Sequence, residues 1–222
     1  MPLFSTAYRP LFAAAALALA GSAHATLLNF DTWSNANRLS YGDRVSVFGP
    51  GYGNSGGATP NVMLEFVDMR AGFGTPESSF FSLWGSGYGS LQNALGHGNY
   101  NVPAQIRLQA DPGFLITLQS FQVGAWSSSS YPDSRIWITD DQGQVLFDTG
   151  TQTFGNNQTL LYQPMASSQG TLTLHINDLG DLGLDNVVFM QSPVPEPGTW
   201  LLLGGGLLAL GGRRLKRHAG PR

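Results

Sequence analysis

Short runs of alternating apolar and polar residues, separated by glycine, proline and asparagine turns, recur from residue 26 to residue 189. Residues 44–48 and 105–110 show the two-residue period of a half-buried strand most clearly. No convincing 3.6-residue period occurs in this region. About ten short strands joined by such turns predict an all-β fold, an antiparallel β-sandwich.

The other expected strands share this short, turn-bounded character: residues 26–31, 61–67, 80–84, 135–139, 144–148, 159–162, 171–176 and 184–189. Residues 114–118 and 121–126 are expected to form one long strand or two short strands. The clearest hairpin joins residues 135–139 to residues 144–148. Glycine-rich residues 85–90 and polar residues 127–133 are expected to form loops. Residues 91–95 are expected to form a helical turn.

The 222-residue chain has no cysteine, which excludes disulfides, thiol catalysis and thiolate zinc sites. All acidic residues lie between Asp31 and Glu196. The cations of the same region are few: Arg38, Arg44, Arg70, Arg107 and Arg135. Nucleic-acid binding needs clustered cations, so this acidic surplus argues against a nucleic-acid partner. The surface suits Ca²⁺ or neutral glycans instead.

The N-terminus has the layout of a secretory signal peptide. Arg9 precedes a short apolar run, and the small residues Ala23 and Ala25 occupy the positions that a signal peptidase inspects. We therefore predict a signal peptide over residues 1–25, cut before Thr26, and export through the inner membrane. The apolar run is too short to be read as a spanning helix.

The C-terminus combines three features without a gap. A proline-bounded stretch comes first, consisting of Val194, Pro195, Glu196, Pro197 and Gly198. An apolar segment over residues 199–212 follows, and the basic end over residues 213–222 includes Arg213, Arg214, Lys216 and Arg217. Proline cannot continue a helix or a central strand, and a cationic cluster resists passage through a bilayer. The sequence therefore predicts a short C-terminal transmembrane helix with its basic side inside.

The apolar segment is short for a permanent anchor. Roughly 15 residues give about 22 Å of helix, whereas a bilayer core is about 30 Å thick. The segment is adequate as a transient stop-transfer element that holds the chain until it is cut upstream. The alternative is a buried C-terminal helix of the globular domain.

This tail resembles the PEP-CTERM sorting signal. The resemblance implies recognition by an exosortase, a membrane-embedded cysteine transpeptidase, and removal of the tail. It also implies transient inner-membrane anchoring, then delivery to the envelope, outer surface or matrix of a Gram-negative cell, often beside exopolysaccharide. The chain then divides into a signal peptide (1–25), a β-sandwich (26–192) and a sorting signal (193–222).

The loop at residues 127–133, the hairpin at 135–148 and the closing segment Gly183-Leu184-Asp185-Asn186-Val187-Val188-Phe189 together resemble a jelly-roll module of the galactose-binding or carbohydrate-binding type. The resemblance implies that the final strand packs beside the first strand. It implies the fold more than the function, because no diagnostic sugar-binding motif accompanies it.

Asp31 and Asp185 are the candidate metal ligands. If the first and last strands pair, both carboxylates could lie near one loop-bound ion, and Ca²⁺ prefers hard oxygen ligands of this kind. The alternative is that Asp185 caps or orients the turn at residues 178–181 without an ion. No other cofactor is expected.

Aromatic residues in or beside glycine-rich or serine-rich loops are the candidate glycan-binding residues. They are Trp84, Tyr88, Trp126 and Tyr131, with Trp33 and Tyr52 in similar surroundings. Aromatic rings can stack on sugar rings, although they are also ordinary packing residues of β proteins. His175 alternates with apolar residues and is expected on the solvent face of its strand.

These features predict a non-enzymatic, exported structural or glycan-associated protein of the cell surface or biofilm matrix. Its expected partners are a signal peptidase, an exosortase-type transpeptidase, the inner membrane and a polysaccharide. The alternative is a surface polysaccharide hydrolase. No serine is expected at a strand-to-helix nucleophile elbow, so no catalytic residue is assigned, but a glycosidase carboxylate pair would exist only in three dimensions.

Overall fold

The computed structural model describes residues 24–30, 45–47, 61–69, 81–98, 102–126, 130–155, 157–194 and 204. Several predicted features lie outside the described residues. They are the signal peptide up to Ala23, the residues Asp31, Trp33 and Tyr52, and the sorting signal from Pro195 onward with the exception of Gly204. Within the described ranges, no helix has the length and apolar character needed to cross a membrane.

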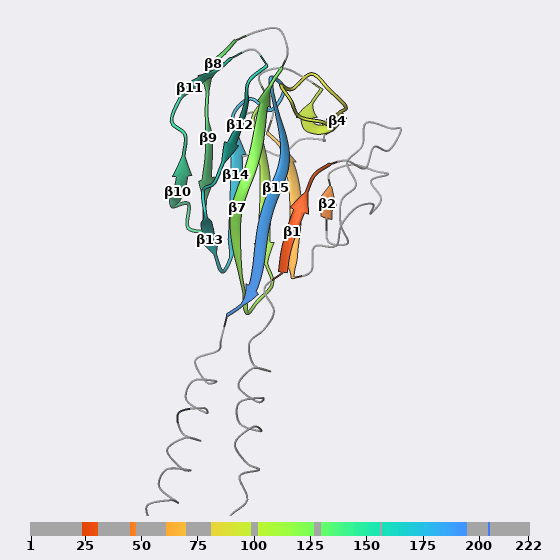
Figure 1. Cartoon of the computed structure of the whole chain (residues 1–222). Coiled ribbons are helices and arrows are strands. Elements are labelled where there is room, and N and C mark those ends of the chain that lie inside the picture. The colour runs from red at the N-terminus through yellow and green to blue at the C-terminus, as the bar shows by residue number, and fades with distance from the viewer. Residues whose placement is uncertain are drawn as a thin grey trace, which may run out of the picture.

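Two sheets pack face to face to form a β-sandwich (Figure 1). In chain order the strands are β1 (His24–Leu28), β2 (Val45–Val47), β3 (Val62–Asp68), β4 (Phe81–Trp84), β5 (Ala94–His97), β6 (Ala104–Ala110), β7 (Phe114–Ala125), β8 (Tyr131–Ser134), β9 (Ile136–Thr139), β10 (Val145–Asp148), β11 (Gln152–Phe154), β12 (Thr159–Tyr162), β13 (Ala166–Ser168), β14 (Thr171–Ile176) and β15 (Leu182–Pro193).

The first sheet has the order β12-β7-β15-β5-β4, with β1 also paired to β15 and β13 to β7. The second sheet has the order β10-β9-β14-β6-β3-β2, and β8 and β11 form a separate two-stranded ribbon. Among the strands that the structure describes, all pairs are antiparallel except β2 with β3. The predicted antiparallel β-sandwich is therefore confirmed, with one parallel pair at an edge.

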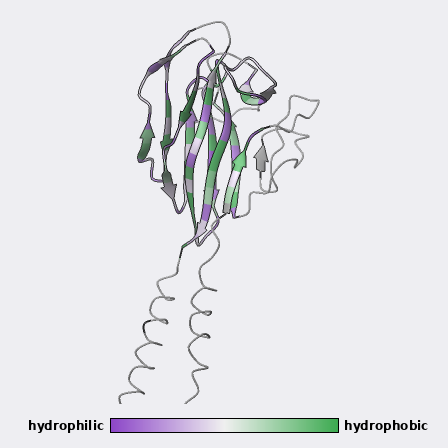
Figure 2. Ribbon diagram, in the orientation of Figure 1, coloured by the Kyte–Doolittle hydropathy of each residue, from purple (hydrophilic) through white to green (hydrophobic). Residues whose placement is uncertain are grey.

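Alternation of side chains builds the core. On β14, Leu172, Leu174 and Ile176 are buried, and the intervening residues face outward. Leu174 lies beside Ile106 of β6 and Ile138 of β9, both also buried. Each such side chain stabilises the fold by roughly 1.5–3 kcal/mol relative to exposure. Figure 2 shows the resulting mixture of hydrophobic and hydrophilic residues along the strands.

The last strand is central. β15 pairs with β7 on one side and with β1 and β5 on the other. The predicted pairing of the first and last strands is confirmed, with Leu28 opposite Val187. β1 begins at His24, opposite Gln191, so the predicted signal-peptidase site between Ala25 and Thr26 lies within a paired strand. A cut there would leave residues 26–28 to pair with β15.

Most of the expected strands are confirmed. β9 and β10 form the predicted hairpin, whose turn is held by Oδ1 of Asp140, which accepts from the backbone N–H of Gln142 and of Gln144. Of the two alternatives for residues 114–126, the single long strand is the one observed, as β7. β15 extends beyond the expected 184–189 at both ends.

Two local predictions were wrong. Residues 91–95 contain no helical turn; Ala94 begins β5, which pairs with β4 and places Leu95 opposite Leu184. Burial of Leu95 between strands outweighs a weak local helical preference. In the expected loop at 127–133, Tyr131 begins β8, which pairs with β11. The polar sequence of residues 131–134 does not predict a strand, because β8 forms only by pairing with β11, which is distant in the sequence.

The two ends of the sandwich differ (Figure 1). β1 begins and β15 ends at one end, where the backbone N–H of Val194 donates to the carbonyl of Gly113 at 2.7 Å. The opposite end carries the loop after β4, the β8–β11 ribbon and the turn at residues 177–181 between β14 and β15. We call this opposite end the apical end.

Candidate functional site

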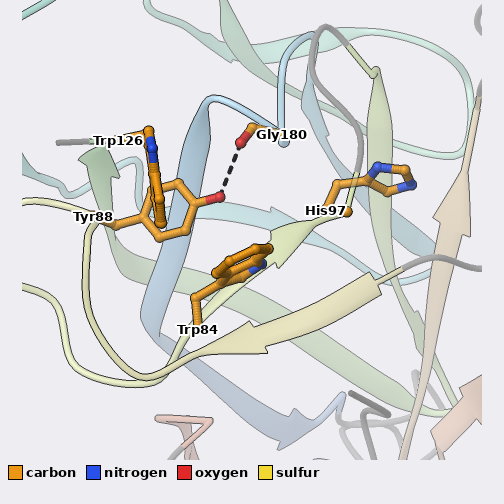
Figure 3. A pocket seen from close by; sticks show the side chains of 6 residues that line it. Trp84, Tyr88, His97, Trp126 and Gly180 are labelled. Carbon is orange, nitrogen blue, oxygen red and sulfur yellow. Dashed lines mark hydrogen bonds between the residues drawn. The ribbon is translucent and has the colours of Figure 1, made fainter. Parts of the chain in front are cut away.

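Three of the four predicted glycan-binding residues meet at the apical end (Figure 3). The ring centroids of Trp84 and Trp126 lie 5.2 Å apart at an interplanar angle of 72°, and those of Tyr88 and Trp126 lie 4.9 Å apart at 65°. Edge-to-face pairs of this kind contribute about 0.5–1.5 kcal/mol each beyond their burial. We call Trp84, Tyr88 and Trp126 the aromatic cluster.

Tyr88 is the buried centre of the aromatic cluster. Its side chain is 1% exposed, and its hydroxyl donates to the carbonyl of Gly180 at 2.9 Å. Its backbone forms an isolated bridge with Trp126. A ring so deeply buried offers no face to a sugar. Tyr88 therefore positions Trp84 and Trp126, which remain partly exposed.

Glycines make room for Tyr88. A Cβ atom on Gly183 of β15 would lie 2.5 Å from Cγ of Tyr88, and one on Gly124 of β7 would collide with the Tyr88 carbonyl. Close approach of this kind is available only where a residue has no side chain. Gly183, the first residue of the predicted Gly183–Phe189 segment, thus provides the surface on which the Tyr88 ring packs.

A small pocket of about 30 Å³ opens beside the aromatic cluster; its lining is Trp84, Tyr88, His97, Gly98, Trp126 and Gly180. The indole Nε1 of Trp84 is buried and has no hydrogen-bond partner among the described residues. An unpaired buried donor costs about 1–3 kcal/mol, and a volume of this size accommodates one water or one hydroxyl group. The pocket therefore offers a hydrogen bond to a small polar group.

Tyr131 does not join the aromatic cluster. It lines a separate hollow of about 340 Å³ on the apical end, together with Pro132, Asp133, Asn177, Asp178 and Asp181. We call this the acidic hollow. Its carboxylates can accept hydrogen bonds from hydroxyl groups, and the Tyr131 ring is partly buried against the core.

The turn at residues 177–181 connects the two features. On one side, Gly180 accepts from Tyr88, and the carbonyl of Asp181 accepts from the backbone N–H of Trp126 at 3.0 Å. On the other side, Oδ1 of Asp178 accepts from the backbone N–H of Asp181, and Nδ2 of Asn177 donates to the carbonyl of Asp133. Residues of this one turn thus bond to the aromatic cluster and line the acidic hollow.

Asp185 is buried in β15. Its Oδ1 accepts from the backbone N–H of Asn186 at 2.6 Å, and its Oδ2 accepts from Nδ2 of the same residue at 3.1 Å. The cap of the turn at residues 178–181 is Asp178. In the described part of the chain, no three acidic, histidine or cysteine side chains form a metal-binding group. Because Asp31 lies outside that part, calcium binding by Asp31 and Asp185 stays a prediction.

His175 lies on the outward side of β14, as its alternation with apolar residues predicts. Its ring is half-buried and stacks on Trp137 of β9, with centroids 4.7 Å apart and planes 3° apart. Sequence reasoning did not single out Trp137, Arg107 or Glu65, which lie on the same side of this sheet. The sequence signal that could have identified them was their alternation with buried apolar residues, which places all three on the outward side of predicted strands.

Residues 193–217 match the family model of the PEP-CTERM protein-sorting motif. The tail of this chain is a PEP-CTERM sorting signal. Export and transient membrane anchoring before processing follow from the PEP-CTERM signal, which is the recognition element for exosortase processing. The match covers the tail alone and assigns no family to the sandwich.

Two of the solved structures that match part of this chain are reported for comparison. One, described as CBM4, is 14% identical with a TM-score of 0.27, and the match covers 60% of this chain and 86% of that chain. The other, the enzymatically active domain of tailspike protein 4 of bacteriophage CBA120, is 16% identical with a TM-score of 0.28; the match covers 59% of this chain and 19% of that chain. Comparison with curated proteins finds no match.

Proposed function

We propose that this protein is an exported, PEP-CTERM-sorted module that binds extracellular polysaccharide through its apical end. It acts as a non-enzymatic component of the cell surface or biofilm matrix. The observation that carries the proposal is the aromatic cluster: two partly exposed indoles, Trp84 and Trp126, fixed by the buried Tyr88, with the unpaired Nε1 of Trp84 beside a hydroxyl-sized pocket.

The chemistry of this end suits sugars. The C–H faces of a sugar ring pack on indoles, and a hydroxyl group can accept the hydrogen bond that Nε1 of Trp84 leaves unmade. In the neighbouring acidic hollow, Asp178 and Asp181 can accept from further hydroxyl groups. Aromatic surface combined with a few placed polar groups is typical of small-ligand sites.

The topology supports this use of the apical end. β15 ends at Pro193, and the sorting motif follows within two residues. β1 begins at the same end of the sandwich as β15 finishes (Figure 1). Both membrane-directed segments therefore leave the sandwich opposite the apical end, which favours an apical end that faces outward while the tail holds the protein at the membrane.

The test uses the processed protein recovered from the extracellular fraction of its host. Its migration is measured in native gels that contain the host exopolysaccharide or a soluble neutral glycan. We expect the glycan to retard the wild type, and we expect Trp126→Ala to lower the affinity for the glycan about tenfold, because one stacked ring contributes on the order of 1–2 kcal/mol. Leu161→Ser, an exposed change on β12, is the matched control. Equal retardation of the Trp126 variant and the control would remove the proposal.

A hydrolase is the second candidate, favoured by the carboxylates of Asp178 and Asp181 in one open hollow. Glycosidases use a pair of carboxylic acids, one as acid and one as base or nucleophile. This candidate predicts release of reducing ends from the bound polysaccharide and loss of that release in Asp181→Asn. Binding without any release of reducing ends would exclude the hydrolase and favour the non-enzymatic binding module.

A further inference from the structure

The acidic hollow carries a negative charge that a neutral sugar would leave unbalanced. β8 contributes residues 131–133 to its lining, and the turn between β14 and β15 contributes Asn177, Asp178 and Asp181. Asp133, Asp178 and Asp181 are acidic, and no basic residue of the described chain belongs to the lining. The charge of the acidic hollow therefore favours a cationic ligand group.

Asp181 is the most informative carboxylate of the acidic hollow. The residue is 6% exposed, and among the described residues its carboxylate has neither a hydrogen-bond donor nor an ion-pair partner. Its backbone N–H donates to Oδ1 of Asp178 at 3.3 Å, and its carbonyl accepts from the N–H of Trp126 at 3.0 Å. A carboxylate that is buried without a partner is costly, so a cation that enters the hollow gains a strong acceptor.

The two arginines of the described part of the chain are engaged elsewhere. Arg107 donates to Glu65 on the second sheet at 3.0 Å. Arg135 follows β8 directly, and its backbone N–H donates to Oδ1 of Asn177 at 2.6 Å. Its guanidinium, however, donates to both carboxylate oxygens of Asp148, at 3.0 and 2.6 Å. Neither guanidinium therefore supplies the missing cation.

The placement of oxygen atoms favours an ammonium group over a metal ion. Calcium needs six to eight oxygen ligands at about 2.3–2.6 Å around one point. Within the ranges that the structure describes, no three acidic side chains converge in this way. An ammonium group needs one acceptor for each of its three N–H donors, at about 2.7–2.9 Å. It can therefore bond to carboxylates that are too far apart to share an ion.

The acidic hollow has the size of one sugar ring with its substituents. Its volume is about 340 Å³, near the lower end of the range of about 300–1,000 Å³ for small-molecule pockets. The partly buried Tyr131 ring offers an apolar surface to C–H groups. Gly180 lines the pocket beside Trp84 (Figure 3), and the next residue, Asp181, lines the acidic hollow. Two rings of one chain can therefore occupy the hollow and the aromatic cluster.

We propose that the acidic hollow binds the ammonium group of an amino sugar, and that the apical end therefore selects a polysaccharide whose amino sugars carry free amines. The ammonium donates to Asp181 and to Asp133 at the exposed rim, while a neighbouring ring packs on Trp126. An N-acetyl group has no positive charge and a single N–H donor, so it cannot make these bonds. This inference rests on the proposed function, because it requires an apical end that receives a polysaccharide.

The experiment compares two ligands that differ only in acetylation, the β-1,4-linked tetramer of glucosamine and that of N-acetylglucosamine. Isothermal titration calorimetry at pH 6 and low salt measures the affinity of each ligand for the full processed protein. Tetralysine serves as an amine that is not a sugar, and calcium chloride serves as the metal probe.

Four variants separate the contributions. Asp181→Asn removes the buried charge with almost no change in shape. Asp133→Asn removes the rim charge and remains informative if Asp181→Asn does not fold, because Asp133 is exposed and its φ of 64° is tolerated by asparagine. Asp141→Asn is the matched control, which removes the same charge from the exposed β9–β10 turn. Trp126→Ala reports on the aromatic cluster, and thermal unfolding verifies the fold of each variant.

We expect the wild type to bind the glucosamine tetramer about tenfold more tightly than the acetylated tetramer, the factor that one charge-assisted hydrogen bond supplies. Asp181→Asn should abolish this preference, Asp133→Asn should reduce it, and Asp141→Asn should retain it. Equal affinity of the wild type for the two tetramers, or no affinity for either, would overturn the proposal. So would a preference that persists in the folded Asp181 and Asp133 variants.

Two further results would assign the acidic hollow to another ligand. Tighter binding of tetralysine than of the glucosamine tetramer, lost in Asp181→Asn, would indicate a protein partner. Thermal stabilisation by calcium alone, lost in the same variant, would indicate a metal site. Either result would overturn the amino-sugar proposal.

The two proposals fail separately. Equal affinity for both tetramers that falls in Trp126→Ala leaves the proposed function standing and removes the preference for amines. A preference that depends on Asp181, together with unchanged affinity in Trp126→Ala, leaves the acidic hollow standing and removes the aromatic cluster as a binding surface.

Discussion

The rings of Trp137 and His175, which belong to adjacent strands, lie parallel within 3° with their centroids 4.7 Å apart. Oε1 of Gln105 accepts two hydrogen bonds from Arg107, so the amide nitrogen of Gln105 donates to Nδ1 of His175, and Nε2 of His175 donates to Oγ1 of Thr139. These bonds hold the imidazole on both sides. A proton on Nδ1 would break the bond from Gln105 and add a charge near Arg107 and Arg135. The stack and its hydrogen bonds therefore stabilise the neutral form of His175.

Stability should therefore fall in mildly acidic solution. The pKa of His175 is lowered from 6.5 to about 4, first by burial and then by the two arginines. Between these values the unfolded chain binds the proton and the folded chain does not. The contribution is fully present above about pH 6.5 and is lost as the pH falls toward 4.

Urea midpoints at pH 7, 5.5 and 4.5 measure this effect. We expect the midpoint of the wild type to drop over this range by more than that of His175→Gln, which cannot titrate but keeps an amide at the same position. Carboxylates titrate equally in both proteins, so the difference isolates His175. Parallel pH curves for the two proteins would contradict the assignment.

Gly183→Ala should destabilise the apical end. The added methyl group would lie 2.5 Å from Cγ of Tyr88, and forced overpacking of this kind costs about 1–3 kcal/mol. Chemical denaturation measures the change. In a Tyr88→Ala background the same substitution should cost much less, because the ring that it meets is gone.

Gly155→Ala provides the comparison, since its nearest neighbour would be Oε1 of Gln158 at an ordinary 3.6 Å. A cost of Gly183→Ala that equals the cost of Gly155→Ala, or that persists without the Tyr88 ring, would show that Tyr88 does not rest on this glycine.

Trp84→Phe should separate stability from binding. The substitution removes the buried Nε1–H that has no partner among the described residues, and so it removes a penalty of about 1–3 kcal/mol that offsets the loss of ring volume. We expect the melting temperature of the unliganded protein to stay within a few degrees of the wild type, whereas glycan retardation falls. A marked drop in melting temperature with normal retardation would identify Trp84 as a purely structural residue.

The sequence was a good guide to the strands and a partial guide to the site. Alternation correctly predicted β6, β9 and β14, because their buried side chains recur every second residue. It failed at β8, since Tyr131-Pro132-Asp133-Ser134 is polar and becomes a strand only by pairing with β11. Residues whose structure depends on a distant partner carry no local signal.

The same reason limited the candidate site. The glycine-aromatic loop after β4 correctly grouped Trp84 with Tyr88, and Trp126 joins them through a bridge to Tyr88. Burial of Tyr88 could not be foreseen, because it depends on Gly124 and Gly183 of two other strands. The stack of Trp137 on His175 was missed for a comparable reason: the two residues are 38 positions apart and become neighbours only through the register of β9 and β14.

The sorting motif lies very close to the folded sandwich. Pro193 still pairs with Phe114, and the backbone N–H of Val194 donates to the carbonyl of Gly113. Pro195 follows directly, and one residue spans at most about 3.6 Å. A membrane enzyme that engages Pro195–Gly198 must therefore approach the turn at residues 111–113 or first release the end of β15.

Inserting eight glycine and serine residues between Val194 and Pro195 should relieve this crowding. We expect pulse-chase labelling in the host to show faster conversion of the precursor to the processed form. The same insertion between Gln142 and Gly143, in the exposed β9–β10 turn, controls for the effect of a flexible segment as such. If the Val194 insertion slows processing or matches the control, the enzyme does not meet the sandwich, and the close spacing of strand and motif has no role in processing.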